Sequence, residues 1–263
     1  TSSIPYQASF IVNPYNKTTN QLNNTFSIVA HDSNTVVEIT PTSDIPNGRL
    51  ANVPFNKTLQ KGEVFIVRNK GNQNLVGSTV KVISTSKKVS VYQGNDCINI
   101  DCGACDHLYE VVLPTSVYGK RFVITPFFGA GNGYRYNIMT TKNNTIIERN
   151  GVPVDTIDIG EQFVEKMSKD SSICISANNP VIITLVMIGC HAISTGDPAI
   201  VYVVPLEQTI KSGIISTANT TIIKTHYINI LLPKPGIQRF YLDGVTIPST
   251  DFNQVYCGDY YFY

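Results

Sequence analysis

The chain of 263 residues carries 20 lysines and arginines against 19 aspartates and glutamates, a net charge of +1. This balance gives no electrostatic reason to expect binding to nucleic acid or to an anionic membrane surface, and no basic run with interleaved aromatic residues occurs. The length suggests one large domain or two modest ones. Thr, Val, Ile and Tyr are abundant while Leu, Ala and Glu are sparse, so the composition favours β-structure over helices.

The longest apolar run is Pro180–Gly189. It is too short for a transmembrane helix, which needs about 20 residues, and it fits a strand that is buried on both faces. The chain begins Thr-Ser-Ser-Ile-Pro, with no basic or apolar leader, so we expect a signal peptide to be absent or already removed. We therefore expect no membrane span, and other signals must indicate the compartment.

Sequons and cysteines indicate a secreted, extracellular protein. The chain has six cysteines and five N-X-Ser/Thr sequons. A cytosolic Asn-rich protein with incidental sequons is the alternative, and the cysteine spacing argues against it. The candidate glycosylation sites are Asn16, Asn23, Asn56, Asn143 and Asn219.

Strand-like segments with turn signals between them follow one another along the chain, as is typical of antiparallel β-sandwiches rather than βαβ units. Asn150-Gly151 and Asp243-Gly244 each lie between two such segments, which predicts type I′ hairpins. The expected strands are 10–12, 26–30, 35–40, 64–68, 80–84, 89–93, 109–113, 122–125, 136–140, 145–148, 154–159, 173–176, 181–188, 200–204, 214–216, 227–232, 240–242 and 245–247.

The chain also resembles itself, which indicates an internal repeat. Leu59–Phe65 (LQKGEVF) is similar to Ile157–Phe163 (IDIGEQF), and Pro114 with the strand after it is similar to Pro205 with its own. We predict an all-β fold of tandem β-sandwich, jelly-roll-like units: unit 1 at 1–106, unit 2 at 107–204 and a partial unit 3 at 205–263. An unfinished third sandwich leaves an open sheet edge, where a neighbouring domain or chain can add a strand.

A cysteine-rich stretch, Gly94–Pro114, lies at the seam between the first two predicted units. Its C-x4-C-x2-C-x-H spacing is compatible with zinc, but structural zinc sites usually combine two short motifs from separate segments, and no second motif is present. In a secreted chain, disulfides are the expected use of such cysteines. The residues in question are Cys97, Cys102, Cys105 and His107.

We prefer a local Cys97–Cys105 bridge, and the connectivity as a whole stays open. A turn near Asn178-Asn179 is expected to place Cys174 and Cys190 out of register, so we do not expect those two to pair. The cysteines left for longer-range pairs are Cys102, Cys174, Cys190 and Cys257.

Catalytic constellations are weak in this sequence. Asp106-His107 and the pair His191 and Asp197 suggest a triad, but the chain has no G-x-S-x-G elbow, and Ser116 lies in a plain turn. Gly129–Gly133 lies between two strand-like runs, so we interpret it as a hairpin loop and not as a phosphate cradle. We expect no enzymatic activity, no cofactor and no metal site.

Two further patterns have structural interpretations. Glu63 and Glu161 follow glycine at matching places in the first two predicted units, and we expect each to fix a turn rather than to act as an acid or base. An aromatic cluster near the C-terminus either forms a strand pair of the third unit or offers a sugar platform or an interface. Its members are Phe252, Tyr256, Tyr260, Tyr261, Phe262 and Tyr263.

Several stretches share one pattern: 59–65 (LQKGEVF), the 78–91 hairpin, 94–97 (GNDC), 104–110 (ACDHLYE) with Leu113-Pro114, and 196–198 (GDP) with 204–208 (VPLEQ). From about Phe26 to the end, the chain thereby resembles the N-terminal domain of IgG Fc-binding protein. Similar domains occur in large secreted, mucus-associated and adhesive glycoproteins, and in some bacterial proteins. The resemblance implies an extracellular binding or structural module without catalytic activity, and it does not imply binding to IgG. Cys102 departs from the family pattern, which leaves the local pairing open.

Three functions therefore compete. The first is adhesion or assembly of an extracellular matrix, mucus or filament through contacts with other extracellular proteins or with copies of the same chain. The second is a lectin-like module that binds glycans through exposed tyrosines and Asn/Asp loops. The third is a secreted hydrolase, for which His107 and His191 are the candidate groups.

Overall fold

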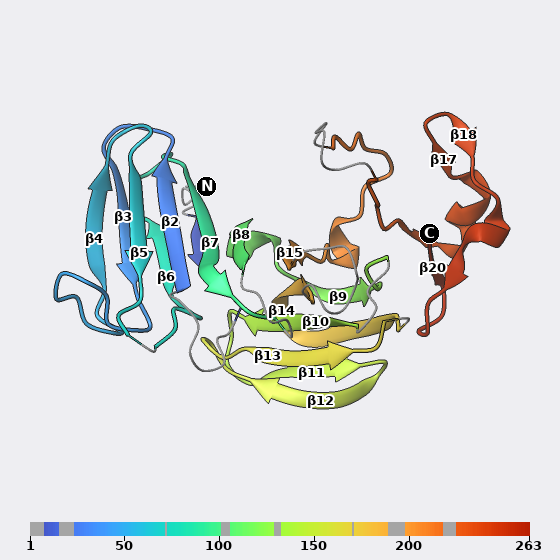
Figure 1. Ribbon diagram of the computed structural model, residues 1–263, viewed down its shortest axis with the longest axis horizontal. Helices are drawn as coiled ribbons and strands as arrows, with labels where there is room; N and C mark the ends of the chain where they lie inside the picture. The colour runs from blue at the N-terminus through green and yellow to red at the C-terminus, as the bar shows by residue number, and fades with distance from the viewer. Residues whose placement is uncertain are drawn as a thin grey trace, which may run out of the picture.

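The computed structural model describes residues 8–15, 24–71, 73–100, 106–128, 133–169, 171–188, 198–217 and 225–263. Antiparallel β-sheet dominates these residues, which confirms the predicted all-β class. In Figure 1 the strands of the first half run vertically at the left, those of the second half run horizontally below the centre, and the C-terminal segment lies at the right. No helix in the described ranges is long and apolar enough to cross a membrane.

The first half is a sandwich, because side chains from both of its sheets meet in one buried cluster that includes Phe26, Ile39, Leu59, Val80 and Val91. Along its strands buried and half-buried residues alternate, as the two-residue period of a strand requires. The back sheet has the order β1 (Ser9–Ile11), β6 (Thr79–Val82), β3 (Thr35–Thr40) and β4 (Phe55–Leu59). The front sheet has the order β5 (Val64–Arg68), β2 (Asn24–Ala30), β7 (Val89–Ile98) and β8 (Asp106–Val111).

The second half pairs its strands in a corresponding way, in the orders β9-β14-β11-β12 and β13-β10-β14-β15. Its buried cluster again draws on both groups of strands, for example through Phe122, Tyr136, Ile147 and Ile183. The unit boundaries proposed above stay a prediction, and β8 begins at the first of them and pairs with β7. The strands are β9 (Gly119–Ile124), β10 (Tyr134–Thr140), β11 (Thr145–Arg149), β12 (Val152–Ile157), β13 (Phe163–Met167), β14 (Ile173–Met187) and β15 (Ala199–Tyr202).

Strand β14 corrects the sequence analysis, because the turn expected near Asn178-Asn179 is absent. One strand of 15 residues runs through this point, and its pairing register shifts between Ser176 and Val181. At this shift the Asn178 side chain links β14 to β11, since its Oδ1 accepts a hydrogen bond from the backbone N–H of Ile146 at 2.9 Å. β14 therefore pairs with β9 and β11 in its first part and with β10 and β15 in its last part.

Two kinds of turn follow their sequence signals. Both residues of Asn150-Gly151 and of Asp243-Gly244 have positive φ, which confirms the type I′ hairpins. Glu63 Oε2 accepts from the backbone N–H of Gln60 at 2.9 Å, and Glu161 Oε2 accepts from that of Asp158 at 2.8 Å. The two glutamates therefore fix matching turns, as predicted. The Gln60 N–H first, and then Lys57, hold the pKa of Glu63 below its usual value.

The first half packs onto the outer face of the β13-β10-β14-β15 layer. Met139 and Ile182 of this layer share a buried cluster with Ile11, Val76 and Tyr118. Val186 and Ile200 share a second buried cluster with four residues that come before the second half, namely Tyr15, Ile98, Ile100 and Leu108.

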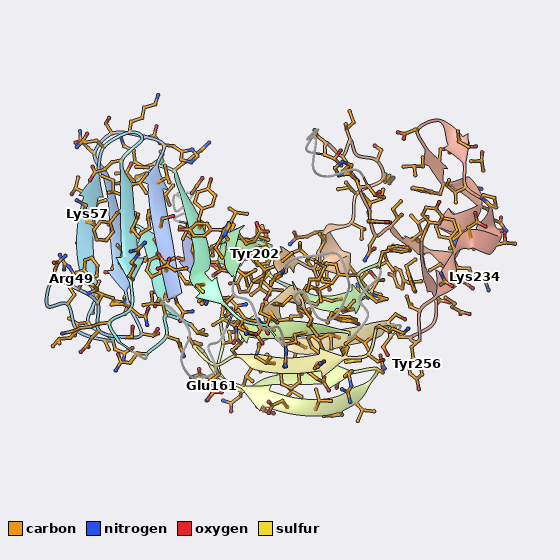
Figure 2. The ribbon with its side chains drawn as sticks, viewed as in Figure 1. Arg49, Lys57, Glu161, Tyr202, Lys234 and Tyr256 are labelled. Atoms are coloured by element: carbon orange, nitrogen blue, oxygen red, sulfur yellow. A yellow bond between two sulfur atoms is a disulfide. The ribbon has the colours of Figure 1, made fainter. Side chains whose placement is uncertain are left out.

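Polar contacts and a close backbone approach add to this junction. Tyr202, which lies between the halves in Figure 2, accepts a hydrogen bond from Gln93 Nε2 at 3.2 Å. A Cβ atom on Gly77 would lie only 2.8 Å from Gly160 Cα, so the two backbones nearly touch there. Apolar clusters, hydrogen bonds and backbone contacts all join the two halves, so the halves form one packed body.

The C-terminal segment, residues 205–263, has little core of its own. Phe252 and Val255 are its buried apolar residues within the described ranges. The strands expected at 214–216 and 227–232 are wrong in the first case and reduced to 231–233 in the second. The short elements are η2 (Leu206–Gln208), β16 (Leu231–Pro233), η3 (Lys234–Arg239), β17 (Tyr241–Leu242), β18 (Val245–Thr246), η4 (Ser249–Asp251), β19 (Asn253–Gln254) and β20 (Tyr260–Phe262).

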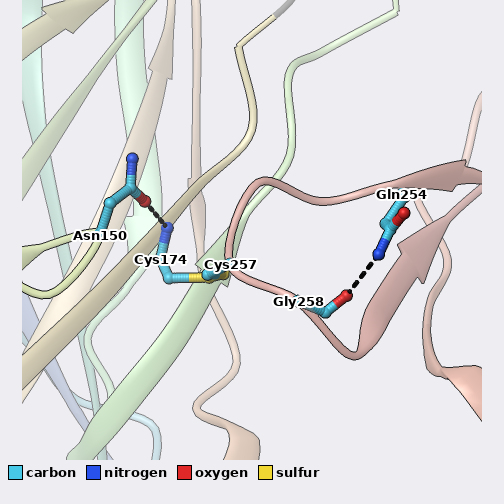
Figure 3. The surroundings of a disulfide bond; sticks show 5 residues. All are labelled: Asn150, Cys174, Gln254, Cys257 and Gly258. Atoms are coloured by element: carbon cyan, nitrogen blue, oxygen red, sulfur yellow. Dashed lines mark hydrogen bonds between the residues drawn. A yellow bond between two sulfur atoms is a disulfide. The ribbon is translucent and has the colours of Figure 1, made fainter.

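A disulfide between Cys174 and Cys257 joins this segment to the start of β14 (Figure 3). Around it, Asn150 Oδ1 accepts from the backbone N–H of Cys174 at 2.9 Å, and Gln254 Nε2 donates to the carbonyl of Gly258 at 3.1 Å. Cys174 thus pairs with Cys257 and not with Cys190. A covalent link that closes a long loop stabilises mainly by restricting the unfolded chain.

Removing this bond should loosen the C-terminal segment selectively. In a Cys174→Ser/Cys257→Ser variant we expect limited proteolysis between 209 and 263 to quicken by about tenfold or more, since poorly packed segments open with little free energy. Mass spectrometry of the fragments measures the rate, and cleavage within residues 24–98 provides the internal control. Equal cleavage rates for variant and native protein would contradict this role of the disulfide.

Candidate protein-interaction surface

The outer face of the front sheet of the first half is apolar. Val64, Ile66, Tyr92, Tyr109 and Val111, which we call the apolar face, expose between 36% and 54% of their surface. The strand register brings them together. Ile66 of β5 and Tyr92 of β7 flank Ser27 of β2, and Val111 of β8 lies opposite Tyr92. The face therefore draws on β5, β7 and β8, with the buried Ser27 of β2 between them, and this row holds no charged residue. Aromatic and aliphatic side chains gathered in this way are typical of protein interfaces.

Polar groups border the apolar face at both ends. Arg68 forms an ion pair with Asp96 at 3.8 Å, and both side chains are partly exposed. At the other end His31 Nε2 lies 2.8 Å from Ser90 Oγ. An apolar centre with a polar rim is the usual anatomy of a protein-docking site.

The back sheet of the same sandwich has a different outer face. Its outward row contains Ser9, Lys81, Glu38 and Asn56, which lie opposite one another across β1, β6, β3 and β4. Asn56 and Lys81 are exposed. Because one face of the sandwich is solvated by polar groups and the other is not, the apolar face marks the side that a partner can cover.

Gly94 shapes the apolar face. It lies directly opposite Tyr109, and a Cβ atom on Gly94 would lie 2.1 Å from the Leu108 carbonyl oxygen and 2.6 Å from Tyr109 Cδ2. The absence of a side chain therefore lets the tyrosine ring lie over the backbone of β7 while the β7–β8 pairing stays close.

The equivalent face in the second half is covered at its centre, while Val164 at its edge keeps 38% of its surface exposed. There the row across β13, β10, β14 and β15 consists of Val164, Asn137, Thr184 and Tyr202, in the same register as Ile66, Ser27, Tyr92 and Val111. Asn137 and Thr184 are fully buried. The junction between the halves thus uses the same sheet face that the first half leaves exposed.

A polar concavity, separate from the apolar face, lies between the second half and the C-terminal segment. Its volume is about 640 Å³, and Arg149, Glu165, Lys166 and Gln254 are among the residues that line it. Glu165 pairs with Arg149 and accepts a hydrogen bond from Tyr136. Burial first, and then this hydrogen bond, raise the pKa of the Tyr136 hydroxyl. Tyr256 lies at the edge of the concavity with 77% of its surface exposed (Figure 2).

Of the residues considered for catalysis or metal binding, the structure describes only some. His107 and Ser116 are exposed, and His191, Asp197, Cys102 and Cys105 lie outside the described residues. Within the described ranges no group of three or more His, Cys, Asp or Glu side chains is placed to hold a metal ion. In the C-terminal aromatic cluster, β20 pairs with β16 and β19, as the strand interpretation expects.

The structure describes only some of the cysteines and of the sequon asparagines. Cys97 is disulfide-bonded, and Cys190 lies outside the described residues like Cys102 and Cys105, so the Cys97–Cys105 bridge stays a prediction. Asn56 and Asn143 lie at exposed positions. The other sequon asparagines, Asn16, Asn23 and Asn219, lie outside the described residues.

The apolar face was not predicted from the sequence, although β5 carries a signal for it. β5 reads Val64-Phe65-Ile66-Val67, with apolar residues at both alternating sets of positions. A strand at a sheet edge whose inward and outward positions are both apolar indicates that each face has a partner.

Together, the fold and this surface define an all-β protein-binding module. A family model, described as IgGFc binding protein, matches residues 6–263, and the chain belongs to this family. This match confirms the resemblance found in the sequence, and the proteins of this family are extracellular binding proteins.

Other comparisons add little. No curated protein matches the sequence. Among solved structures, an anti-sigma factor domain-containing protein matches with 11% identity and a TM-score of 0.21, over 76% of this chain and 82% of that chain. Its likeness carries no argument about this protein.

A substitution at Gly94 tests the geometry of the apolar face. We expect Gly94→Val to lower the free energy of unfolding by about 1–3 kcal/mol, because the added carbons overlap backbone and ring atoms. Tyr92→Val, on the same strand and the same face, adds no clash and should change stability much less. Urea unfolding of both variants measures the difference, and equal stability would show that β8 lies farther from β7 than described.

Proposed function

We propose that this protein is an extracellular structural or adhesive glycoprotein module that mediates protein–protein contacts in the assembly of a matrix, mucus or filament. The observation that carries the proposal is the apolar face of the first half, together with the burial of the equivalent face in the second half. A surface of this kind is unfavourable in water unless a partner covers it.

The rest of the architecture supports such a role. The chain is stiffened where its halves share buried clusters, and a disulfide holds the C-terminal segment. The exposed sequon at Asn56 lies on the polar back face, so a glycan there would keep that face solvated and leave the apolar face free. Secretion and glycosylation are part of this proposal.

Binding to extracellular material tests the proposal directly. The purified chain should bind matrix or mucus isolated from its native source, and Ile66→Lys should weaken this binding by about tenfold or more, because a charge is placed at the centre of the apolar contact. Val152→Lys, at an exposed apolar position on edge strand β12, is the matched control. Both changes are at the surface and should leave unfolding within about 0.5 kcal/mol of the native protein.

The outcomes separate clearly in a sedimentation or surface-binding assay. Loss of binding in the Ile66→Lys variant alone supports the proposal. Undiminished binding in that variant, or an equal loss in the Val152→Lys variant, would contradict a role for the apolar face.

Glycan binding is the second candidate function, and the polar concavity favours it. An exposed aromatic ring beside charged and amide groups offers both a stacking surface and hydrogen bonds to sugar hydroxyls. Tyr256 supplies the ring, and Arg149, Glu165 and Gln254 supply the polar groups.

A glycan array can decide this second candidate. The chain should retain defined glycans, and Tyr256→Ala should weaken their binding by about tenfold, the effect of losing one aromatic contact. Tyr241→Ala, at another exposed tyrosine, should have no effect. An array without hits at high protein density would contradict lectin activity.

A further inference from the structure

At the junction between the two halves, the start of the first sandwich packs on the outer face of the β13-β10-β14-β15 layer. Pro114, just before η1 (Thr115–Val117), forms a bridge with Phe10 of β1. From β1 itself, Ile11 points outward into the cluster with Met139 and Ile182. Just after β1, Gln162 Nε2 donates hydrogen bonds to Asn13 Oδ1 and to the Pro14 carbonyl.

A second junction repeats part of this arrangement one step later. η2 packs beside β9, since a Cβ atom on Gly119 would lie 2.2 Å from Pro205 Cβ and Arg121 pairs with Glu207 at 3.2 Å. After β9, Asn229 Nδ2 donates to Thr125 Oγ1 at 3.1 Å and to the Pro126 carbonyl at 2.9 Å. The Thr125-Pro126 pair therefore contacts the C-terminal segment much as Asn13-Pro14 contacts the second half.

The two short helices are followed by apolar pairs at the same spacing. Val123-Ile124 follows η1 and Ile214-Ile215 follows η2, and Ile11-Val12 occupies the same place in the first half. The burial of these pairs differs. Ile11-Val12 is buried, whereas Ile214 is fully exposed and Ile215 is 64% exposed. Val123-Ile124 is buried as well. The segment 209–217 thus carries a strand-like apolar pattern without the burial that this pattern has elsewhere.

Two complementary surfaces are therefore left open at opposite parts of the chain. One is the apolar face of the first half, which has the strand register of the covered face in the second half. The other is segment 209–217, which follows η2 as β9 follows η1 and which corresponds to the β1 segment, whose Ile11 covers the sheet face of the second half. Its exposed apolar residues are Ile210, Ile214 and Ile215.

We propose that the apolar face binds segment 209–217 of a second copy of this chain, in a head-to-tail contact. The proposal deepens the function proposed above and rests on it, because it names the partner of the same face. The contact joins two different surfaces, so it does not close on itself as a two-fold dimer does. Repeated along the molecules, it produces a linear assembly.

Complementary variants test this contact in the full chain with its disulfides intact. Sedimentation velocity over a range of concentrations should show native protein in species larger than dimers. Ile66→Lys removes the face and Ile214→Lys removes the segment, and each variant alone should associate about tenfold or more weakly than native protein. An equal mixture of the two should form dimers and nothing larger, because each pair retains a single intact contact.

A control and three contrary outcomes complete the test. Val152→Lys lies outside both surfaces and should associate like native protein. The proposal is overturned if native protein stays monomeric at all concentrations, if Ile214→Lys associates undiminished, or if the mixture stays monomeric. If native protein is monomeric while its binding to matrix still depends on Ile66, the copy-to-copy contact fails and the proposed function stands.

Discussion

The packing of one sandwich edge on the outer face of the next sheet is the constraint on which this structure depends. Each sandwich buries its own interior, but Met139, Ile182 and Val186 lie outside that interior and need the first half to cover them. Burial of side chains of this size contributes about 1.5–3 kcal/mol each, so the junction is a substantial part of the fold. The halves are therefore expected to lose stability together when the junction is disturbed.

The same constraint explains why the two sheet faces of the first half differ. A face that stays in water needs polar groups, as in the row of Lys81, Glu38 and Asn56. A face that receives a neighbour is stabilised by apolar groups, as Met139 and Ile182 show in the second half, where Asn137 and Thr184 are buried beside them. Tyr92 and Val111 make the front face of the first half apolar, like a face that receives a neighbour, although this face is exposed.

Much of the fold could be predicted from the sequence, because strand period and turn chemistry are local. β3 and β5 begin and end at the expected residues, and Asn150-Gly151 forms its hairpin as expected. The edge strands β4 and β13 were missed because Asn56, Lys57, Glu165 and Lys166 interrupt their apolar pattern. Edge strands are solvated along one side and need less apolar surface than central ones.

The long-range features could not be predicted, because they depend on contacts between distant segments. Asn178-Asn179 has the composition of a turn, but β14 continues through it, and the Asn178 side chain accepts a hydrogen bond from the backbone N–H of Ile146 on the distant strand β11. The Cys174–Cys257 pair joins residues 83 positions apart, and no local pattern indicates such a partner. The apolar face needed the register of four strands before its members could be recognised as neighbours.

Strand β14 also has a mechanical consequence. The C-terminal segment is tied through Cys257 to Cys174, the second residue of β14, and β14 is hydrogen-bonded to β9, β10, β11 and β15. A pulling force applied at the C-terminus loads β20 first, because β20 lies beyond Cys257, and then passes through the disulfide into this central strand. To move β14 along its length, such a force must break hydrogen bonds to several neighbours at once. The weakly packed end of the chain is in this way fastened to its best-supported strand.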